Sequence, residues 1–143
     1  MPALKPTTFG SHRLGVSSKH TDIDLLVFAP EFADRDRHFF GTLVEEVRRA
    51  IELQDLHLIQ QAFVPIIKLR ASDVQVDMLL VRLIDSSLSS EDLVQADLAQ
   101  LCADRESVIG LNGYRVSVSI EGLVPDVARY KQLLRSVKLW ARR

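Results

Sequence analysis

The sequence predicts an α+β domain, and three observations support this prediction. The apolar run over residues 25–29 is typical of a buried strand. Two further apolar runs, 63–70 and 74–81, are separated by three residues, which predicts a β-hairpin. Apolar residues recur at helical spacing over residues 38–53 and again after Pro125. Together these segments can bury one shared core.

The segments between these elements have weaker patterns. Residues 1–8 contain two prolines, which predicts an extended segment rather than a helix. Residues 31–37 predict a charged surface connection, and residues 56–59 fit a short edge strand.

The second half of the chain begins with a polar stretch. Residues 85–103 predict irregular structure with one short helix near residues 91–94. From Asp104 the apolar spacing is helical again. Three glycines interrupt this pattern and predict a broken helix or a helix–loop–helix rather than one rod: Gly110, Gly113 and Gly122.

Composition limits the class of protein. With 143 residues, of which 47% are hydrophobic, the chain can bury the core of one domain. The net charge is −1, so any contact with nucleic acid is expected to be local. Cys102 is the only cysteine, which excludes an internal disulfide and fits a reducing compartment. No signal peptide or bilayer-spanning run is present, so we expect an intracellular protein with no membrane partner.

The stretch 9–28 carries the chemistry. Asp22 and Asp24 stand one residue apart at the head of the predicted strand, where alternate side chains share a face. Paired carboxylates repel unless a cation lies between them, and hard oxygen ligands suit Mg²⁺. Upstream, Gly10 permits close backbone approach, and the amides that follow Ser11 can point at a phosphate. The alternative is that both motifs are ordinary, since Asp-x-Asp and Gly-Ser are common in turns and caps.

Asp77 is the odd residue of the second hairpin strand, because a carboxylate is unfavourable to bury there without a partner. One interpretation is a solvated face shared with Gln75. The other makes Asp77 a third carboxylate beside Asp22 and Asp24. Three carboxylates that hold two divalent ions would serve both ends of an in-line displacement.

The last predicted helix carries a basic row at helical spacing, formed by Lys131, Arg135, Lys138 and Arg142. This row is either a solvated helix face or, if it faces the carboxylates, a screen for triphosphate charge or a grip on a nucleic-acid backbone.

These residues resemble the signature of the DNA polymerase β-like nucleotidyltransferases, and within them that of the eukaryotic nuclear poly(A) polymerases. The resemblance covers nearly the whole chain, with Asp77 at the place of the third carboxylate, and rests on residues 9–16, 22–24, 62–69, 111–116, 123–125 and 134–143. It implies an α+β nucleotidyltransferase fold, with a mixed sheet of about four to five strands packed with helices and a helical segment after it. The implied domains are a catalytic domain over residues 1–103 and the start of a central helical domain over residues 104–143.

The resemblance also implies an activity. The protein would be a template-independent polynucleotide adenylyltransferase that adds AMP from ATP to RNA 3′ ends by a two-metal mechanism, as in mRNA polyadenylation. Asp22, Asp24 and Asp77 would be the catalytic and metal-binding residues for two Mg²⁺ (or Mn²⁺) ions. Asp77 would also help to deprotonate the attacking RNA 3′-hydroxyl.

The implied nucleotide-binding residues are Phe9, Gly10, Ser11, Asn112 and Lys138. Gly10 and Ser11 would lie at the triphosphate of ATP, Asn112 at the sugar and base, and Lys138 at a phosphate. The implied partners are ATP, the RNA 3′ end and 3′-end processing factors, and the implied location is the nucleus.

Some positions depart from the family pattern. The family usually carries a glycine in the loop where this chain has residues 17–20, and a tyrosine where it has His12. Residues 117–119 stand where the family usually has a threonine and an acidic pair. The chain also ends in or just after the last predicted helix, whereas the family's polymerases continue. We therefore expect a fragment that is weak or inactive alone.

Two alternatives stay open. One is a nucleotidyltransferase with another base or acceptor specificity, because the carboxylates and the Gly-Ser pair do not distinguish bases. The other is a truncated, non-catalytic binding or scaffolding module.

Overall fold

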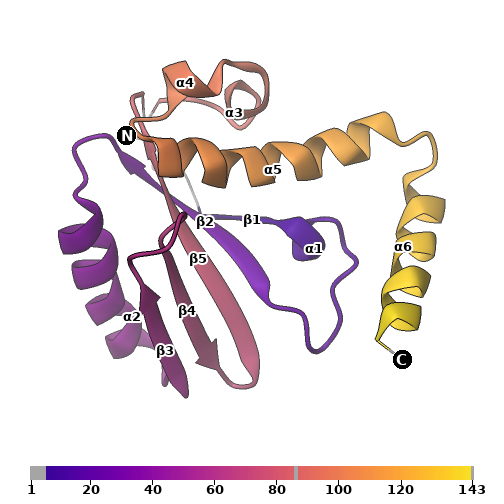
Figure 1. The fold of residues 1–143 in the computed structure, drawn as a ribbon, viewed down its shortest axis with the longest axis horizontal. Coiled ribbons are helices and arrows are strands. Elements are labelled where there is room, and N and C mark those ends of the chain that lie inside the picture. The colour runs from indigo at the N-terminus through magenta and orange to yellow at the C-terminus, as the bar shows by residue number, and fades with distance from the viewer. Residues whose placement is uncertain (1–5, 86, 143) are drawn as a thin grey trace.

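The fold is built on one mixed five-stranded sheet, seen in a computed structural model that describes residues 6–85 and 87–142 (Figure 1). The strand order is β1-β2-β5-β4-β3, and β2 and β5 run parallel while every other neighbouring pair is antiparallel. The bounds are Thr7–Phe9 for β1, Ile23–Pro30 for β2, Asp55–Ile59 for β3, Ile66–Ala71 for β4 and Val74–Leu83 for β5. This architecture confirms the predicted α+β class, with β3 as an edge strand.

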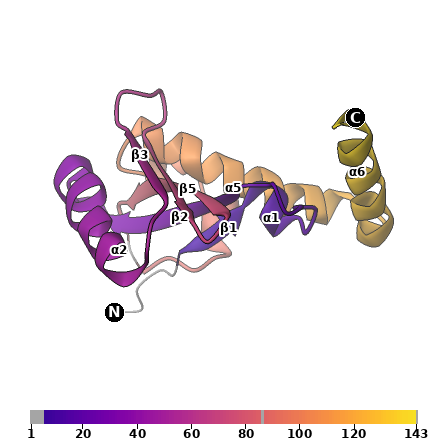
Figure 2. The same ribbon diagram turned by 90° about the horizontal axis from the view of Figure 1, so that it is seen from below.

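Helices cover both faces of the sheet (Figures 1 and 2). Their bounds are Gly10–Arg13 for α1, Arg35–Leu43 for η1, Val44–Ala50 for α2, Asp92–Gln95 for α3, Leu98–Leu101 for α4, Arg105–Leu123 for α5 and Val127–Ala141 for α6. On one face, Phe39, Phe40 and Val44 of η1 and α2 pack with buried residues of β4 and β5. On the other face, Leu111 and Tyr114 of α5 pack with buried residues of β2 and β5. The central strands are therefore buried on both sides.

The helix predicted over residues 38–53 begins three residues before the predicted start and ends three residues before the predicted end. Its first part, η1, is π-helical and starts at Arg35, because the Asp34 side chain caps it by accepting a hydrogen bond from the Arg37 amide at 2.7 Å. Its second part ends at Ala50, and Ile51 is extended and exposed. The prediction that residues 31–37 form only a connection was thus wrong for the last three of them.

The hairpin was predicted, but its first strand is shorter than expected. β4 begins at Ile66, after Pro65, and Phe63 is 69% exposed outside it. The turn has two residues, Ser72 and Asp73, both in the left-handed region with φ of 48° and 64°. Such a two-residue turn sets the register between the two strands that it connects, β4 and β5.

The broken helix predicted after Asp104 is instead one continuous helix of 19 residues, α5. Gly110 and Gly113 allow close packing rather than ending the helix, which continues past Gly122 to Leu123. A Cβ atom at Gly110 would lie 3.4 Å from Val81, and one at Gly113 would lie 3.2 Å from the Phe9 ring. Burial against the sheet therefore outweighs the low helix propensity of glycine, about 1 kcal/mol per residue.

An ion network fixes the start of α5 to the end of the sheet. The Asp104 carboxylate pairs with Arg35 at 3.1 Å and with Arg82 of β5 at 2.7 Å, and it caps α5 by accepting a hydrogen bond from the Ser107 amide. Burial by itself would raise the pKa of Asp104, but the hydrogen bonds from Ser107 and Arg82 and the charge of Arg35 lower it to about 2.

The last helix, α6, begins as predicted after Pro125, with the Asp126 side chain accepting a hydrogen bond from the Arg129 amide at 2.9 Å. It projects beyond the sheet next to α1 (Figure 1), and its Leu133, Leu139 and Trp140 are exposed. Across the described ranges 6–85 and 87–142, no helix has the length and apolar character needed to span a bilayer.

Candidate functional site

Two of the predicted carboxylates lie side by side in the centre of the sheet. Asp24 of β2 and Asp77 of β5 are direct register partners on neighbouring parallel strands. Each alternates along its strand with residues of the core beneath α5, such as Leu26 and Val81, so both carboxylates project on the α5 side. The interpretation of Asp77 as part of a solvated face was thus wrong, because Asp77 is only 7% exposed.

Asp77 is held by one lysine and keeps one oxygen unpaired. Its Oδ2 accepts a hydrogen bond from Lys68 Nζ, in an ion pair with the residue directly opposite on β4. Its Oδ1 is buried and has no hydrogen-bond partner among the described residues. A buried carboxylate oxygen without a partner is unfavourable, so it is available for a cation or a proton donor.

Asp24 lies against the glycine turn. Gly10 has φ +62°, and a Cβ atom at this position would lie 2.7 Å from Asp24 Oδ2. Burial raises the pKa of Asp24 above its ordinary value, the charges of Asp77 and Asp22 raise it further, and Lys68 opposes them. The site therefore holds more negative charge than its own cations offset, which favours an added cation.

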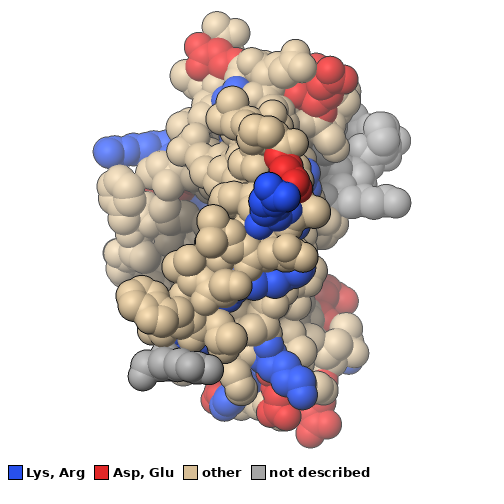
Figure 3. Space-filling view, turned by 90° about the vertical axis from the view of Figure 1, so that its right-hand side faces the viewer, with Lys and Arg blue, Asp and Glu red and all other residues tan. Residues whose placement is uncertain are grey.

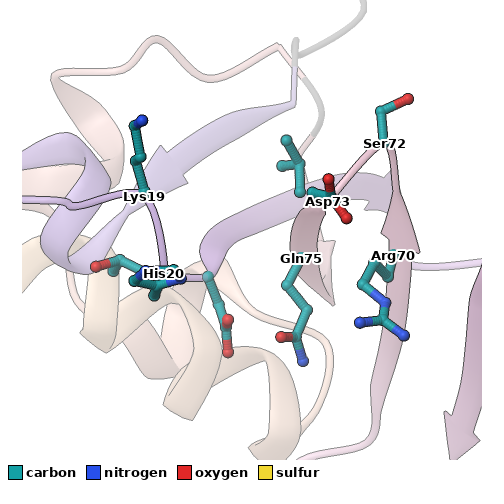
Figure 4. Close-up of a pocket in the computed structure, with 9 residues that line it drawn as sticks. Lys19, His20, Arg70, Ser72, Asp73 and Gln75 are labelled. Carbon is teal, nitrogen blue, oxygen red and sulfur yellow. The ribbon is translucent and has the colours of Figure 1, made fainter.

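Asp22 lies just before β2 and is partly buried. It lines a cleft of about 680 Å³ between the connection that precedes β2 and the β4–β5 turn. Figure 4 shows Lys19 and His20 on one side of this cleft and Arg70, Ser72, Asp73 and Gln75 on the other. The cleft therefore opens beside Asp22.

The Gly-Ser pair begins the short helix α1. The Gly10 amide donates a hydrogen bond to the Ser117 hydroxyl of α5 at 3.0 Å, and Ser117 is 3% exposed. Phe9 is the register partner of Asp24 and packs against Gly113 of α5. The turn is thus fixed between the sheet and α5.

The basic row of α6 faces the chain between α1 and β2, so it is not simply a solvated face. Lys138 Nζ donates to Ser11 Oγ at 2.8 Å and to the Val16 carbonyl at 3.3 Å. Arg135 donates to the Gly15 carbonyl, and Arg142 donates to hydroxyls of the same connection. In Figure 3, which views the side where α6 lies, separate Lys and Arg side chains cross a mostly uncharged surface.

Asn112 lies on α5 and is exposed. Its neighbour Gly113 packs on Phe9, so Asn112 belongs to the part of α5 that covers the Gly-Ser turn. Its predicted contact with the nucleotide stays a prediction.

Sequence reasoning missed two site residues. Lys68 depends on the length of the hairpin turn: the observed two-residue turn at Ser72 and Asp73 places residue 68 opposite residue 77, whereas the predicted three-residue connection would place it opposite residue 76. Ser117 gives no such signal, since only packing of α5 on the sheet brings it to Gly10.

The donor set fits a divalent ion in part. No group of three or more His, Cys, Asp or Glu side chains among residues 6–85 and 87–142 is arranged to hold one ion. Magnesium, however, commonly uses one or two carboxylates and takes its other ligands from water and phosphate. Asp24, with its raised pKa, and Asp77, with its unpaired buried oxygen, meet that need.

Comparisons with known proteins agree with this geometry. The family model of the poly(A) polymerase nucleotidyltransferase domain matches residues 3–124. Poly(A) polymerase PAPalpha of Candida albicans is 36% identical over 96% of this chain and 24% of its own length. Poly(A) polymerase pla1 of Schizosaccharomyces pombe is 37% identical over 95% of this chain and 24% of its own length. Nuclear poly(A) polymerase 1 of Arabidopsis thaliana is 35% identical over 95% of this chain and 19% of its own length. The chain thus spans about a quarter or less of these relatives.

Solved structures share the fold. A structure of Cid1, described for its RNA terminal uridylyl transferase activity, has a TM-score of 0.60 at 22% identity and covers 97% of this chain and 35% of its own. A structure of a Cid1 poly(U) polymerase mutant bound to MgATP has a TM-score of 0.62 at 21% identity. The match covers 99% of this chain and 36% of the Cid1 chain.

Proposed function

The chain belongs to the poly(A) polymerase nucleotidyltransferase family, and from this premise we propose that it is the catalytic part of a template-independent RNA adenylyltransferase. The reaction is attack of an RNA 3′-hydroxyl on the α-phosphate of ATP, which adds AMP and releases pyrophosphate. The observation that carries the proposal is the pairing of Asp24 with Asp77 on neighbouring strands, directly beside the turn at Gly10.

In this proposal Asp22, Asp24 and Asp77 hold Mg²⁺ or Mn²⁺. The metal supplies charge neutralisation for the triphosphate and for the oxygens that react. The chain itself supplies the proton acceptor. Asp77 Oδ1 is buried and unpaired, so it takes the proton of the attacking 3′-hydroxyl.

The triphosphate lies at the start of α1. Gly10 permits close approach of the backbone, Ser11 offers its hydroxyl, and Lys138 already reaches this hydroxyl with its ammonium group. Phe9 and Asn112 complete the nucleotide site from β1 and α5. Positioning and charge stabilisation supply most of the catalysis, as in other phosphoryl transfers.

The RNA 3′ end enters by the cleft beside Asp22, where Lys19, His20 and Arg70 offer positive or polar groups. The proposed partners beyond RNA and ATP are 3′-end processing factors, and the proposed location is the nucleus, as the name of the Arabidopsis relative suggests for that protein. We propose that residues 1–103 form the catalytic domain and that residues 104–143 form the start of a central helical domain.

A second candidate is uridylyl transfer by the same site. It is favoured by the shared fold with the Cid1 structures, one of which is described by its selectivity for UTP although it holds MgATP. A third candidate, a binding module without catalysis, would leave the carboxylates without a metal.

Calorimetric titration of the chain with each nucleoside triphosphate in the presence of Mn²⁺ separates these candidates. Selective binding of ATP that is lost in Asp24→Asn and Asp77→Asn supports adenylyl transfer, and a labelled RNA primer then tests AMP incorporation. Selective binding of UTP supports the second candidate. Indifference to all four nucleotides contradicts both and supports the third.

A further inference from the structure

A row of polar side chains crosses the α5 side of the sheet through the carboxylates. The register places Asp24 opposite Asp77, Asp77 opposite Lys68, and Lys68 opposite His57. The row therefore runs over β2, β5, β4 and β3, with Lys68 as the immediate neighbour of Asp77. Directly opposite side chains on paired strands interact most strongly.

The two side chains of the Lys68–Asp77 ion pair differ in their exposure to solvent. The Asp77 side chain is 10% exposed and lies on a central strand, whereas the Lys68 side chain is 34% exposed. Lysine carries its charge on a flexible four-carbon stem, so its ammonium can leave while the carboxylate stays. A carboxylate buried in this way needs a cation beside it, which Lys68 supplies.

We propose that Lys68 competes with the divalent ion for Asp77, so that binding of the ion displaces the Lys68 ammonium from Oδ2. This inference rests on the proposed function, in which Asp77 is a metal ligand. The repulsion between an ammonium and a divalent ion is twice that between two single charges, and it grows as the separation falls. Each cation therefore weakens the binding of the other to this carboxylate, and Lys68 lowers the affinity of the site for the ion.

Arg70 provides a matched control on the same strand and the same face. It stands two residues after Lys68, opposite Gln75 rather than Asp77, and its ion pair is with Asp55 of β3. Removal of either side chain changes the net charge by one, but only Lys68 contacts the proposed metal ligand. A general charge effect therefore acts in both variants, and displacement acts only in one.

The first test is titration of the chain with Mn²⁺ alone, followed by calorimetry. We expect Lys68→Met to bind Mn²⁺ at least about tenfold more tightly than the unaltered chain, because it has lost the competing cation, a difference of about 1.4 kcal/mol. Lys68→Arg should bind no more tightly than the unaltered chain, and Arg70→Met should differ by less than about threefold. Equal gains in Lys68→Met and Arg70→Met, or no gain in Lys68→Met, would overturn the proposal.

The second test is thermal unfolding with and without Mn²⁺, monitored by circular dichroism. Without Mn²⁺, Lys68→Met leaves Asp77 buried and unpaired, so its Tm should fall. Mn²⁺ should then raise the Tm of Lys68→Met more than that of the unaltered chain, since tighter binding stabilises more. An equal or smaller rise would overturn displacement. If no variant responds to Mn²⁺ in either test, the metal site of the proposed function fails, and the inference fails with it.

Discussion

The backbone amide of Gly10 donates a hydrogen bond to the hydroxyl of Ser117, which lies 3.0 Å away and 107 residues later in the chain. Ser117 in turn donates a hydrogen bond to the Gly113 carbonyl within α5, so its hydroxyl is used both as acceptor and as donor. One buried side chain thus connects the turn proposed to hold the triphosphate with the helix that covers it. The threonine expected from the family pattern is replaced here, but the hydroxyl is kept.

Ser117→Ala should lower stability and weaken nucleotide binding together. It leaves the Gly10 amide without its acceptor, which costs about 1–3 kcal/mol for a buried group. Ser117→Thr keeps the hydroxyl and should retain most of the affinity for MnATP. The exposed Ser119 offers the control Ser119→Ala, measured by the same calorimetry and chemical unfolding. A Ser117→Ala variant as stable as Ser119→Ala would contradict the connection.

Asp24→Asn should raise stability while it removes function. The pKa of Asp24 is raised by burial and by the charges of Asp77 and Asp22, so its ionised form destabilises the fold at neutral pH. Removal of that charge should stabilise the chain by about 0.5–2 kcal/mol, as single stabilising substitutions commonly do. Binding of Mn²⁺ with ATP should be lost.

Chemical unfolding and calorimetry measure these two opposite effects. Asp55→Asn is the control, since Asp55 pairs with Arg70 and should lose a little stability instead. A loss of stability in Asp24→Asn would show that the carboxylate is already compensated within the fold.

Lys138→Met should weaken binding of ATP about 10–150-fold, which corresponds to the loss of a charged hydrogen bond of about 1.5–3 kcal/mol. Lys131→Met removes the same charge seven residues earlier on α6, where the ammonium pairs with Glu121 at 3.3 Å. It should leave the affinity for ATP within about threefold, because the Lys131 ammonium contacts Glu121 of α5 and not the Ser11 hydroxyl at the proposed phosphate position. Equal losses in both variants would point to the overall charge of α6 rather than to contact with the phosphate.

Asp104 should govern the acid side of the stability curve. Its pKa of about 2 in the folded chain lies below the value of about 4 in an unfolded chain, so its ion pairs stabilise fully above pH 4. That contribution should be lost as the pH falls from about 4 to about 2. Asp104→Asn should therefore lower the free energy of unfolding at pH 7 by about 1.5–3 kcal/mol. Between about pH 2 and pH 4 the free energy of unfolding of this variant should change less with pH than that of the unaltered chain. Urea unfolding at several pH values measures this, with the exposed Asp73→Asn as control.

Replacement of residues 17–20 by glycine-rich sequence should weaken RNA binding more than ATP binding. The Ser18 amide donates to Thr21 Oγ1 at 3.0 Å, and Arg142 donates to both hydroxyls, so this connection is held in one shape beside the cleft. Fluorescence anisotropy with a short oligoadenylate and calorimetry with ATP separate the two affinities. A larger loss for ATP would contradict the placement of RNA in the cleft.

Local sequence patterns predicted the strands β2, β3, β4 and β5 and placed Asp22 and Asp24 at the head of β2, whereas β1 was predicted only as part of an extended segment. The predicted three-residue connection would pair residue 68 with residue 76, so the pairing of Lys68 with Asp77 became clear only from the two-residue turn in the structure. The glycines of α5 were misjudged, because intrinsic propensity favours a break while packing against Val81 and Phe9 requires small residues there. The start of η1 was missed because the helix was placed by its apolar spacing, which begins only after the charged residues that follow the Asp34 cap.

The sequence alone therefore determined the α+β class, the Gly-Ser turn and the aspartates at the head of β2, since each depends on residues that are close in the chain. Only the tertiary structure decided that Asp77 meets Asp24, that Ser117 holds Gly10, and that α6 directs its basic row at the turn. These contacts join residues more than 50 positions apart. No local pattern encodes them, because they arise from the parallel pairing of β2 with β5 and from helices that bury their faces on that sheet.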